Sequence, residues 1–307
     1  MKEKQEKISM ESTLKSLDTE EFIDIHFYRP IGYRWALLFN KFDISPNTVT
    51  IAGIFIGISA GICFYFSSLS LNILGMLLLI WANSYDSADG QLARMTGKKS
   101  PLGRILDGLC GTLWFVVIYL AIGFRLTPSC GRWIWALIFT TGYFHSKQAA
   151  MADYYRNIHL FFLKGKSGSE LSNSVSLKEN YKLMSWKSDF IYKLFDSYYI
   201  HYTEEQEAWT PRFQKMMQVV RQKFGEDIPG RFRAAFREKS LPLMKYTNML
   251  SFNTRVIALF ISLIINLPWL YFIFELTLLN GMLVYMVIKH GRICSKLRIQ
   301  ILSDHYD

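Results

Sequence analysis

Cysteine is scarce in this sequence, and its few cysteines do not form a metal-binding pattern. Cys63, Cys110, Cys130 and Cys294 lie in or beside apolar runs, without the spacing of a zinc site. We expect them to pack as small apolar side chains. The N-terminus lacks the apolar stretch of a cleavable signal peptide, and no internal repeat is evident. These absences argue against a cysteine metal centre, a leader that is removed and a repeat architecture.

Apolar residues, in contrast, are abundant. They make up 50% of the 307 residues, and several apolar runs approach the ~20 residues needed to cross a bilayer. This pattern predicts an all-α integral membrane protein with about six transmembrane helices. We expect spans at about 48–66, 69–85, 102–124 and 133–156, and two more within 252–289 that turn near Pro268. In the first span, Gly53, Gly57 and Gly61 form a small face that allows close helix contact.

The formal net charge of +10 raises the question of a nucleic-acid partner. The basic residues lie mainly beside spans, where they set topology and meet anionic lipid, so we expect membrane lipids and no nucleic acid as partners. The face opposite the termini shows only Arg125 and Arg132. By the positive-inside rule, both termini, the acidic stretch 86–111 and the polar segment 164–250 face the cytosol, at the inner membrane if the source is bacterial.

Composition divides the chain into five parts. Residues 1–19 are predicted to be a mobile charged arm, and 20–163 an interfacial helix followed by four spans. The interfacial segment is amphipathic and interrupted by Pro30; a cytosolic docking helix is the alternative. Residues 164–250 are predicted to be a cytosolic helical insertion, in which Thr203 opens a helix that continues past Pro211. Residues 251–298 would hold the last two spans and 299–307 a cytosolic tail.

The stretch 86–111 carries the chemistry. Asp86 and Asp89 follow the second span three residues apart, and Asp107 begins the third. Carboxylates at the mouth of spans are costly and indicate function, usually with a cation as partner. Three oxygen ligands from two helix ends suit Mg²⁺ or Mn²⁺. The alternative is that these aspartates merely end a helix.

Neighbouring residues suit a diphosphate. On a helix, Gly90 and Ala93 share the face of the first two aspartates and leave room beside them. Arg94, Lys98 and Arg104 are candidate phosphate contacts, since a guanidinium can bind phosphate through two hydrogen bonds.

These residues resemble the signature of the CDP-alcohol phosphotransferase family, an Asp-x-x-Asp-Gly-x-x-Ala-Arg block followed by a Gly-x-x-x-Asp-x-x-x-Asp block. The first block is complete, and Gly103 and Asp107 begin the second. Arg29-Pro30 and Ser45-Pro46-Asn47 also look like the family's N-terminal end. The resemblance implies transfer of a phosphatidyl or phospho-alcohol group from a CDP-linked lipid or CDP-alcohol to an alcohol acceptor. It also implies that the reaction depends on a divalent metal and releases CMP. The product would be a membrane phospholipid, for example of the inositol or sphingolipid type.

One family position differs. Gly111 stands where the family has its last aspartate, which serves there as metal ligand and favoured general base. In one interpretation the chain is still a transferase. Its catalytic residues are then Asp107 and His145, and His145 is the substitute base. The alternative for His145 is a packing residue or a solvated helix end.

In another interpretation the chain is a catalytically impaired relative that binds metal and CDP-lipid in a regulatory role. A transporter is a weaker third alternative, because the charges gather at one face and do not line a path across the membrane. The motif does not choose the acceptor alcohol. A homodimer is usual among relatives of this appearance.

Overall fold

The computed structural model describes residues 16–98, 100–165, 168–303 and 306, so most of the expected charged arm (1–19) lies outside the described residues. The structure is 83% helical, without a strand in the part of the chain it describes. The predicted all-α class is therefore confirmed.

The helices belong to two compact units, which are described separately. The first unit comprises the described residues within 1–143 and 255–274, and the second those within 144–254 and 275–307. In chain order the helices are α1 (Arg29–Lys41), α2 (Pro46–Cys63), α3 (Leu69–Thr96), α4 (Pro101–Cys130), α5 (Ile134–Lys164), α6 (Ser174–Leu183), α7 (Phe190–Trp209), α8 (Pro211–Phe224), α9 (Gly230–Met249), α10 (Phe252–Ile264), α11 (Trp269–Phe274) and α12 (Asn280–Leu302).

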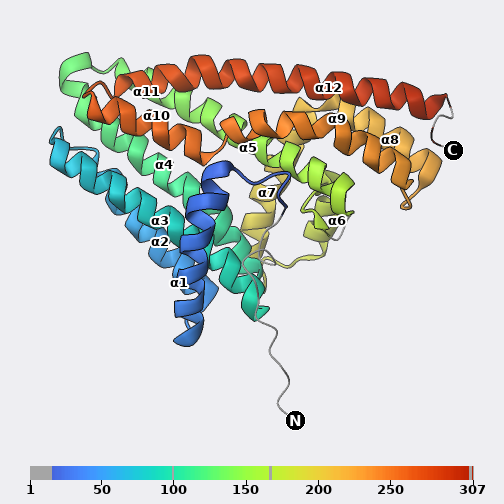
Figure 1. Ribbon diagram of the computed structural model, residues 1–307, viewed down its shortest axis with the longest axis horizontal. Helices are drawn as coiled ribbons and strands as arrows, with labels where there is room; N and C mark the ends of the chain where they lie inside the picture. The colour runs from blue at the N-terminus through green and yellow to red at the C-terminus, as the bar shows by residue number, and fades with distance from the viewer. Residues whose placement is uncertain (1–15, 99, 166–167, 304–305, 307) are drawn as a thin grey trace, which may run out of the picture. The chain divides into compact units, whose positions relative to one another are not determined.

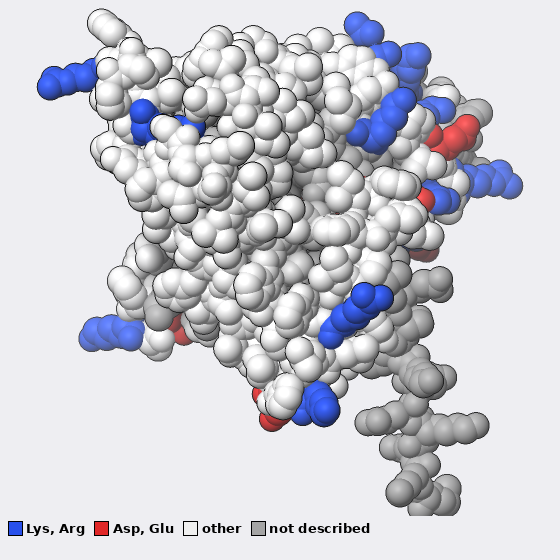
Figure 2. Space-filling model, turned by 60° about the vertical axis from the view of Figure 1, so that its left-hand side comes forward, with Lys and Arg blue, Asp and Glu red and all other residues white. Residues whose placement is uncertain are grey.

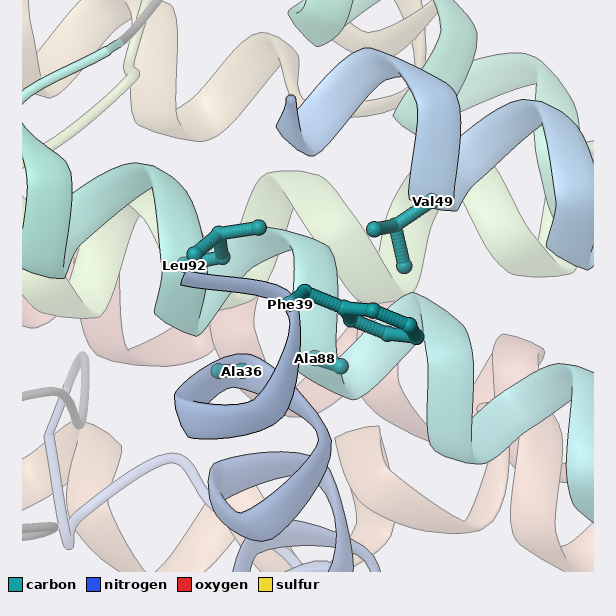
Figure 3. Packing of buried hydrophobic residues seen from close by; sticks show 5 residues of the cluster. All are labelled: Ala36, Phe39, Val49, Ala88 and Leu92. Atoms are coloured by element: carbon teal, nitrogen blue, oxygen red, sulfur yellow. The ribbon is translucent and has the colours of Figure 1, made fainter. Parts of the chain in front are cut away.

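In the first unit, α3 packs against both α1 and α2 (Figure 1). Figure 3 shows the apolar cluster that joins these helices, formed by Ala36 and Phe39 of α1, Val49 of α2, and Ala88 and Leu92 of α3. All five side chains are nearly or fully buried. Since the two α3 residues flank Asp89 in sequence, this cluster holds in place the part of α3 that carries the acidic motif.

The glycine face of α2 allows α4 to approach closely, as predicted. A Cβ added at Gly57 would lie 2.2 Å from Nε1 of Trp114, and one at Gly61 would lie 3.2 Å from the backbone nitrogen of Ile118. A side chain at either position therefore requires the neighbouring atoms of α4 to shift.

The segment before α2 differs in detail from the prediction. The backbone is helical from Phe22 to Lys41, and Pro30 lies in the first turn of α1 rather than interrupting a helix. A π-helical segment, Asp24–Tyr28, precedes it. The prediction of an interruption was wrong, since the backbone stays helical on both sides of Pro30 and changes from π-helical to α-helical geometry just before it.

Four helical segments of the described residues are long and apolar enough to cross a membrane. They are Pro46–Cys63, Ile105–Cys130, Gly230–Ile264 and Trp269–Leu302. Most of the face drawn in Figure 2 carries neither acidic nor basic side chains, as expected for helices that meet lipid. The turn near Pro268 separates α10 from α11 as predicted. Helices α3 and α5 coincide with two further expected spans, and the count of six stays a prediction.

In the second unit, α12 packs against α8 and α9, and α6 packs against α7. Helices α6 to α9 occupy the predicted insertion, whose cytosolic location stays a prediction. The expected helix start at Thr203 was wrong, since Thr203 lies within α7 and its hydroxyl donates to the Tyr199 carbonyl. The new helix, α8, begins at Pro211.

Candidate metal and phosphate site

Three aspartates converge in the first unit. Asp86 and Asp89 lie on α3 and Asp107 lies on α4. One carboxylate oxygen from each lies within 4.8 Å of the other two. The convergence expected from the sequence is therefore confirmed. Three carboxylates this close repel one another, and a cation among them would remove the repulsion.

Local sequence signals turn the chain so that α3 and α4 present these aspartates to each other. Helix α3 ends at Gly97, whose φ of +68° suits glycine. Helix α4 begins after Ser100, whose hydroxyl accepts a hydrogen bond from the Gly103 N–H at 2.9 Å. The short connection between these two residues returns Asp107 alongside α3.

Gly103 has a packing role at this turn. The Ser100 hydroxyl donates to Oδ1 of Asn47 at 3.2 Å, which ties the start of α4 to the start of α2. A Cβ at position 103 would lie only 2.6 Å from the same Oδ1. A side chain at position 103 would therefore displace the Asn47 amide from its hydrogen bond with Ser100. The phosphate contact of Gly103 that the resemblance implies stays a prediction.

The three carboxylates differ in their surroundings. Asp89 is only 4% exposed and accepts a hydrogen bond from Thr50 of α2, with an Oγ1–Oδ2 distance of 2.5 Å. Asp86 is hydrogen-bonded to the Cys110 thiol of α4. Asp107 is exposed. The protein thus holds two of the carboxylates and leaves Asp107 accessible to a substrate. Sequence reasoning missed Thr50 and Cys110, for which no local pattern signals a contact with α3.

Arg94 lies on the same helix, with its guanidinium over Gly90. A Cβ at Gly90 would lie 3.4 Å from both terminal nitrogens of Arg94. The Nε and Nη2 atoms of Arg94 are buried and have no hydrogen-bond partner among the described residues. Buried N–H groups without a partner are costly. An oxyanion at this position would satisfy them.

A second arginine, from the segment before α2, adds to the charge of the site. Arg29 forms an ion pair with Glu20 at 2.9 Å, and both Nε and Nη2 of the guanidinium donate to this carboxylate. The positive charge of Arg29 acts on Asp86. Sequence reasoning assigned this segment to the membrane interface and missed its electrostatic contribution.

The remaining predicted phosphate contacts lie around this core. Lys98 forms an ion pair with Asp43 at 2.8 Å, and both side chains are exposed. The hydrogen bond from Lys98 lowers the pKa of the Asp43 carboxyl. Ala93 is partly buried on α3. The side chain of Arg104 lies outside the described residues.

Gly111, one helical turn beyond Asp107 on α4, faces open space. A Cβ built there meets no atom of the described residues within 4 Å. The backbone therefore has room for a side chain at the position where the family carries its last aspartate.

His145 belongs to the second unit, in a polar cluster of its own. Its Nδ1 lies 3.4 Å from Oε1 of Glu275, which is fully buried at the start of the π-helical segment Glu275–Leu279. Gln148 donates to the Glu275 carbonyl at 3.2 Å and to Oδ1 of Asn280 at 2.7 Å. Nothing in the sequence near His145 signals a partner 130 residues away.

The geometry agrees with a family assignment. Residues 43–157 match the family described as CDP-alcohol phosphatidyltransferase. This segment contains the three aspartates, Arg94 and Gly111. The match confirms, for residues 43–157, the resemblance seen in the sequence.

Curated relatives match over part of their length. Choline/ethanolaminephosphotransferase 1 of Arabidopsis thaliana is 30% identical over 104 residues, which cover 30% of this chain and 26% of that protein. Choline/ethanolaminephosphotransferase 2 of the same plant is 28% identical over 121 residues, 36% of this chain and 30% of that protein. An uncharacterized protein of Aquifex aeolicus (strain VF5) is 34% identical over 85 residues, 28% of this chain and 42% of that protein. The chain thus matches less than half the length of each.

Proposed function

We propose that this protein transfers a phospho-alcohol or phosphatidyl group from a CDP-linked donor to an alcohol in the membrane and releases CMP. One observation carries the proposal. Three convergent carboxylates lie on the same two helices as an arginine whose buried N–H groups have no partner among the described residues. A divalent cation and a diphosphate would satisfy both groups together.

The donor set fits Mg²⁺ or Mn²⁺. Asp86, Asp89 and Asp107 supply oxygen ligands from two helices within 4.8 Å of one another, and such ions prefer carboxylates, waters and substrate phosphates. When bound, the ion would neutralise charge on the diphosphate and on the leaving CMP. The Thr50 hydroxyl keeps the Asp89 carboxylate oriented toward the other two aspartates.

Arg94 is the proposed contact for the diphosphate. Its guanidinium lies against Gly90, where a larger residue would fill the space beside it. Two N–H groups pointing to one phosphate would fix the orientation of the donor before reaction. Gly90 and Ala93 would allow the nucleotide to approach the helix, and Gly103, Lys98 and Arg104 are further candidates for the phosphates.

The reaction itself exchanges one P–O bond for another. The acceptor hydroxyl oxygen forms a bond to the phosphorus of the transferred group, the bond from that phosphorus to the CMP oxygen breaks, and the hydroxyl proton passes to a base. Asp107 is one candidate base because it is the exposed member of the trio. His145 is the other, and its contact with Glu275 supports a fixed orientation of the imidazole.

The names of two relatives support CDP-choline or CDP-ethanolamine as the first donors to test. Acceptors of the diacylglycerol, inositol and sphingolipid types remain within the proposal. We also propose that the site faces the cytosol, where nucleotide-activated donors occur, and that the protein forms a homodimer.

The deciding experiment measures CMP release by the full-length protein in detergent. Each of CDP-choline, CDP-ethanolamine and CDP-diacylglycerol is combined with a panel of alcohols and with Mg²⁺, Mn²⁺ or EDTA. We expect CMP with at least one pair of substrates, and its loss in EDTA. Binding of a CDP-linked donor without CMP release would instead favour the regulatory alternative, which the glycine at position 111 supports.

Gly111→Asp is expected to strengthen metal binding. The position has open space, lies one turn from Asp107 on the same helix face, and would add a fourth carboxylate. We expect the Mg²⁺ concentration for half-maximal activity or binding to fall roughly tenfold, as for an added charged ligand. Gly111→Asn is the matched control, with nearly the same volume and no charge. Equal metal dependence of the two variants would contradict a site that lacks one ligand.

His145→Gln tests the proposed base. Glutamine can still donate a hydrogen bond to Glu275 but cannot take up the acceptor proton at neutral pH. We expect kcat to fall by roughly 10²-fold or more with little change in KM or unfolding temperature. His201→Gln, at an exposed histidine of the same unit, should behave as the wild type. An unchanged kcat would leave His145 with a packing role.

A further inference from the structure

A basic groove lies between α9 and α12 in the second unit, outside the segment that matches the family. The two helices run side by side (Figure 1), and the groove between them has a volume of about 670 Å³. Five cationic side chains line it, namely Lys239, Lys245, Lys289, Arg292 and Lys296. Among the described residues, no acidic side chain lines the groove. The cations therefore repel one another without a neutralising partner.

Helical periodicity explains why these cations meet. On α12, Tyr285, Lys289, Arg292 and Lys296 recur at i, i+4, i+7 and i+11, which places them on one face. That face is turned toward α9, because both helices line the same groove. Cations gathered in a groove indicate a binding site for an anion more specifically than basic residues scattered at the end of a span.

Two tyrosines contact each other and two of the lysines. Tyr246 of α9 and Tyr285 of α12 are in edge-to-face contact, with ring centroids 5.1 Å apart. The ammonium of Lys245 lies 4.7 Å from the centroid of Tyr246, and that of Lys289 lies 5.6 Å from the centroid of Tyr285. These cation–π contacts restrict two flexible lysines, so part of the ordering that an anion would require is already in place.

The groove also has an apolar component. Pro242, Leu243 and Ile293 line it together with the cations. Inorganic phosphate has no apolar part that could pack against this surface. The glycerol and the first methylenes of a phospholipid can pack there. Moreover, α12 belongs to the apolar segment Trp269–Leu302, and the cations follow its most apolar part in sequence. The groove therefore lies where a span would reach the level of lipid headgroups.

We propose that this groove binds an anionic phospholipid, with its phosphate among Lys289, Arg292 and Lys296 and its apolar part against Leu243 and Ile293. The site is separate from the aspartate trio, and it requires no turnover. A bound acidic lipid would hold α9 and α12 together by neutralising the charges that otherwise repel.

The test measures binding of dioleoyl phosphatidic acid to the full-length protein in a neutral detergent by native mass spectrometry. We expect the variant Lys289→Gln/Arg292→Gln/Lys296→Gln to bind on the order of 100-fold more weakly, from three lost lipid–cation contacts. The matched control is Lys182→Gln/Lys187→Gln/Arg231→Gln, which removes the same charge from exposed positions outside the groove. The affinity of this control for phosphatidic acid should lie within about twofold of the wild-type affinity, because no lipid–cation contact is lost.

Three outcomes would overturn the proposal. One is equal loss of binding in the groove variant and the control variant. Another is equal binding of zwitterionic dioleoyl phosphatidylcholine, which would mean that the cations do not select the ligand. The third is displacement of the lipid by glycerol 3-phosphate at equal concentration, which would assign the groove to a free phosphate. Asp89→Asn should bind phosphatidic acid as the wild type does, so failure of the proposed transferase activity leaves this result unaffected.

Discussion

Asp89→Asn is expected to reduce CMP release roughly 10³-fold or more, since a metal ion at a transferring phosphate supplies several kcal/mol of stabilisation. Asparagine has the same volume as aspartate and can still accept the hydrogen bond from Thr50. It removes one negative charge from a group of carboxylates within 4.8 Å of one another. The loss should therefore appear as loss of metal affinity and not of folded protein.

Thermal unfolding separates these two effects. In EDTA, Asp89→Asn should unfold at the same temperature as the wild type or higher, because repulsion of Asp89 by Asp86 and Asp107 is relieved. Added Mg²⁺ should raise the unfolding temperature of the wild type, since a ligand bound only by the folded state stabilises it. The variant should show little of this rise.

Asp227→Asn is the matched control, because Asp227 is exposed in the connection between α8 and α9. It should retain wild-type turnover and the full response to Mg²⁺. Near-native turnover of Asp89→Asn, or an undiminished response of its unfolding temperature to Mg²⁺, would show that the trio is not a metal site.

Gly57→Leu is expected to abolish the yield of folded protein, and Gly57→Ala to destabilise it by about 1–3 kcal/mol, as overpacking does. Even a Cβ at this position would lie 2.2 Å from Nε1 of Trp114, whose side chain is only 1% exposed. Because the indole is buried, we expect α2 and α4 to separate. Monodispersity in detergent and the unfolding temperature report the result.

Two further variants test this explanation. Gly281→Ala lies at a helical glycine, where an added Cβ would meet no atom within 4 Å in the part of the chain that the structure describes. It should be neutral or slightly stabilising, since alanine favours a helix by about 1 kcal/mol over glycine. Trp114→Phe should partly rescue Gly57→Ala, because a smaller ring leaves room for the methyl group. A Gly57→Ala protein as stable as the wild type would contradict the close approach of α2 to α4.

Sequence reasoning succeeded where the signal is local. Helical spacing places Asp86 and Asp89 on one face of α3, and the runs of apolar residues predict the helices of the spans. These features depend on residues within four positions of one another, so the chain needs no distant contact to express them. The all-α class and the shared helix face of Asp86 and Asp89 were predictable for this reason.

Local reasoning was wrong where one sequence pattern is compatible with two local structures. Thr203 and the acidic residues after it suit a helix start, but α7 is already helical from Phe190 and the Thr203 hydroxyl donates back to Tyr199. Pro30 suits a break, but it is equally suited to the first turn of α1. Whether a helix starts, breaks or continues at such a residue depends on whether the preceding turn is stabilised by packing. That packing involves residues elsewhere in the chain.

Contacts between distant residues were decided by tertiary packing alone. Thr50 reaches Asp89 across 39 positions, and His145 meets Glu275 across 130. The open space beside Gly111 and the unpartnered N–H groups of Arg94 likewise exist only once the helices have packed. Residue types and spacing therefore identify the groups capable of chemistry here. The distances and burial that make them a site arise from side chains brought together by folding, and no sequence period encodes such pairs.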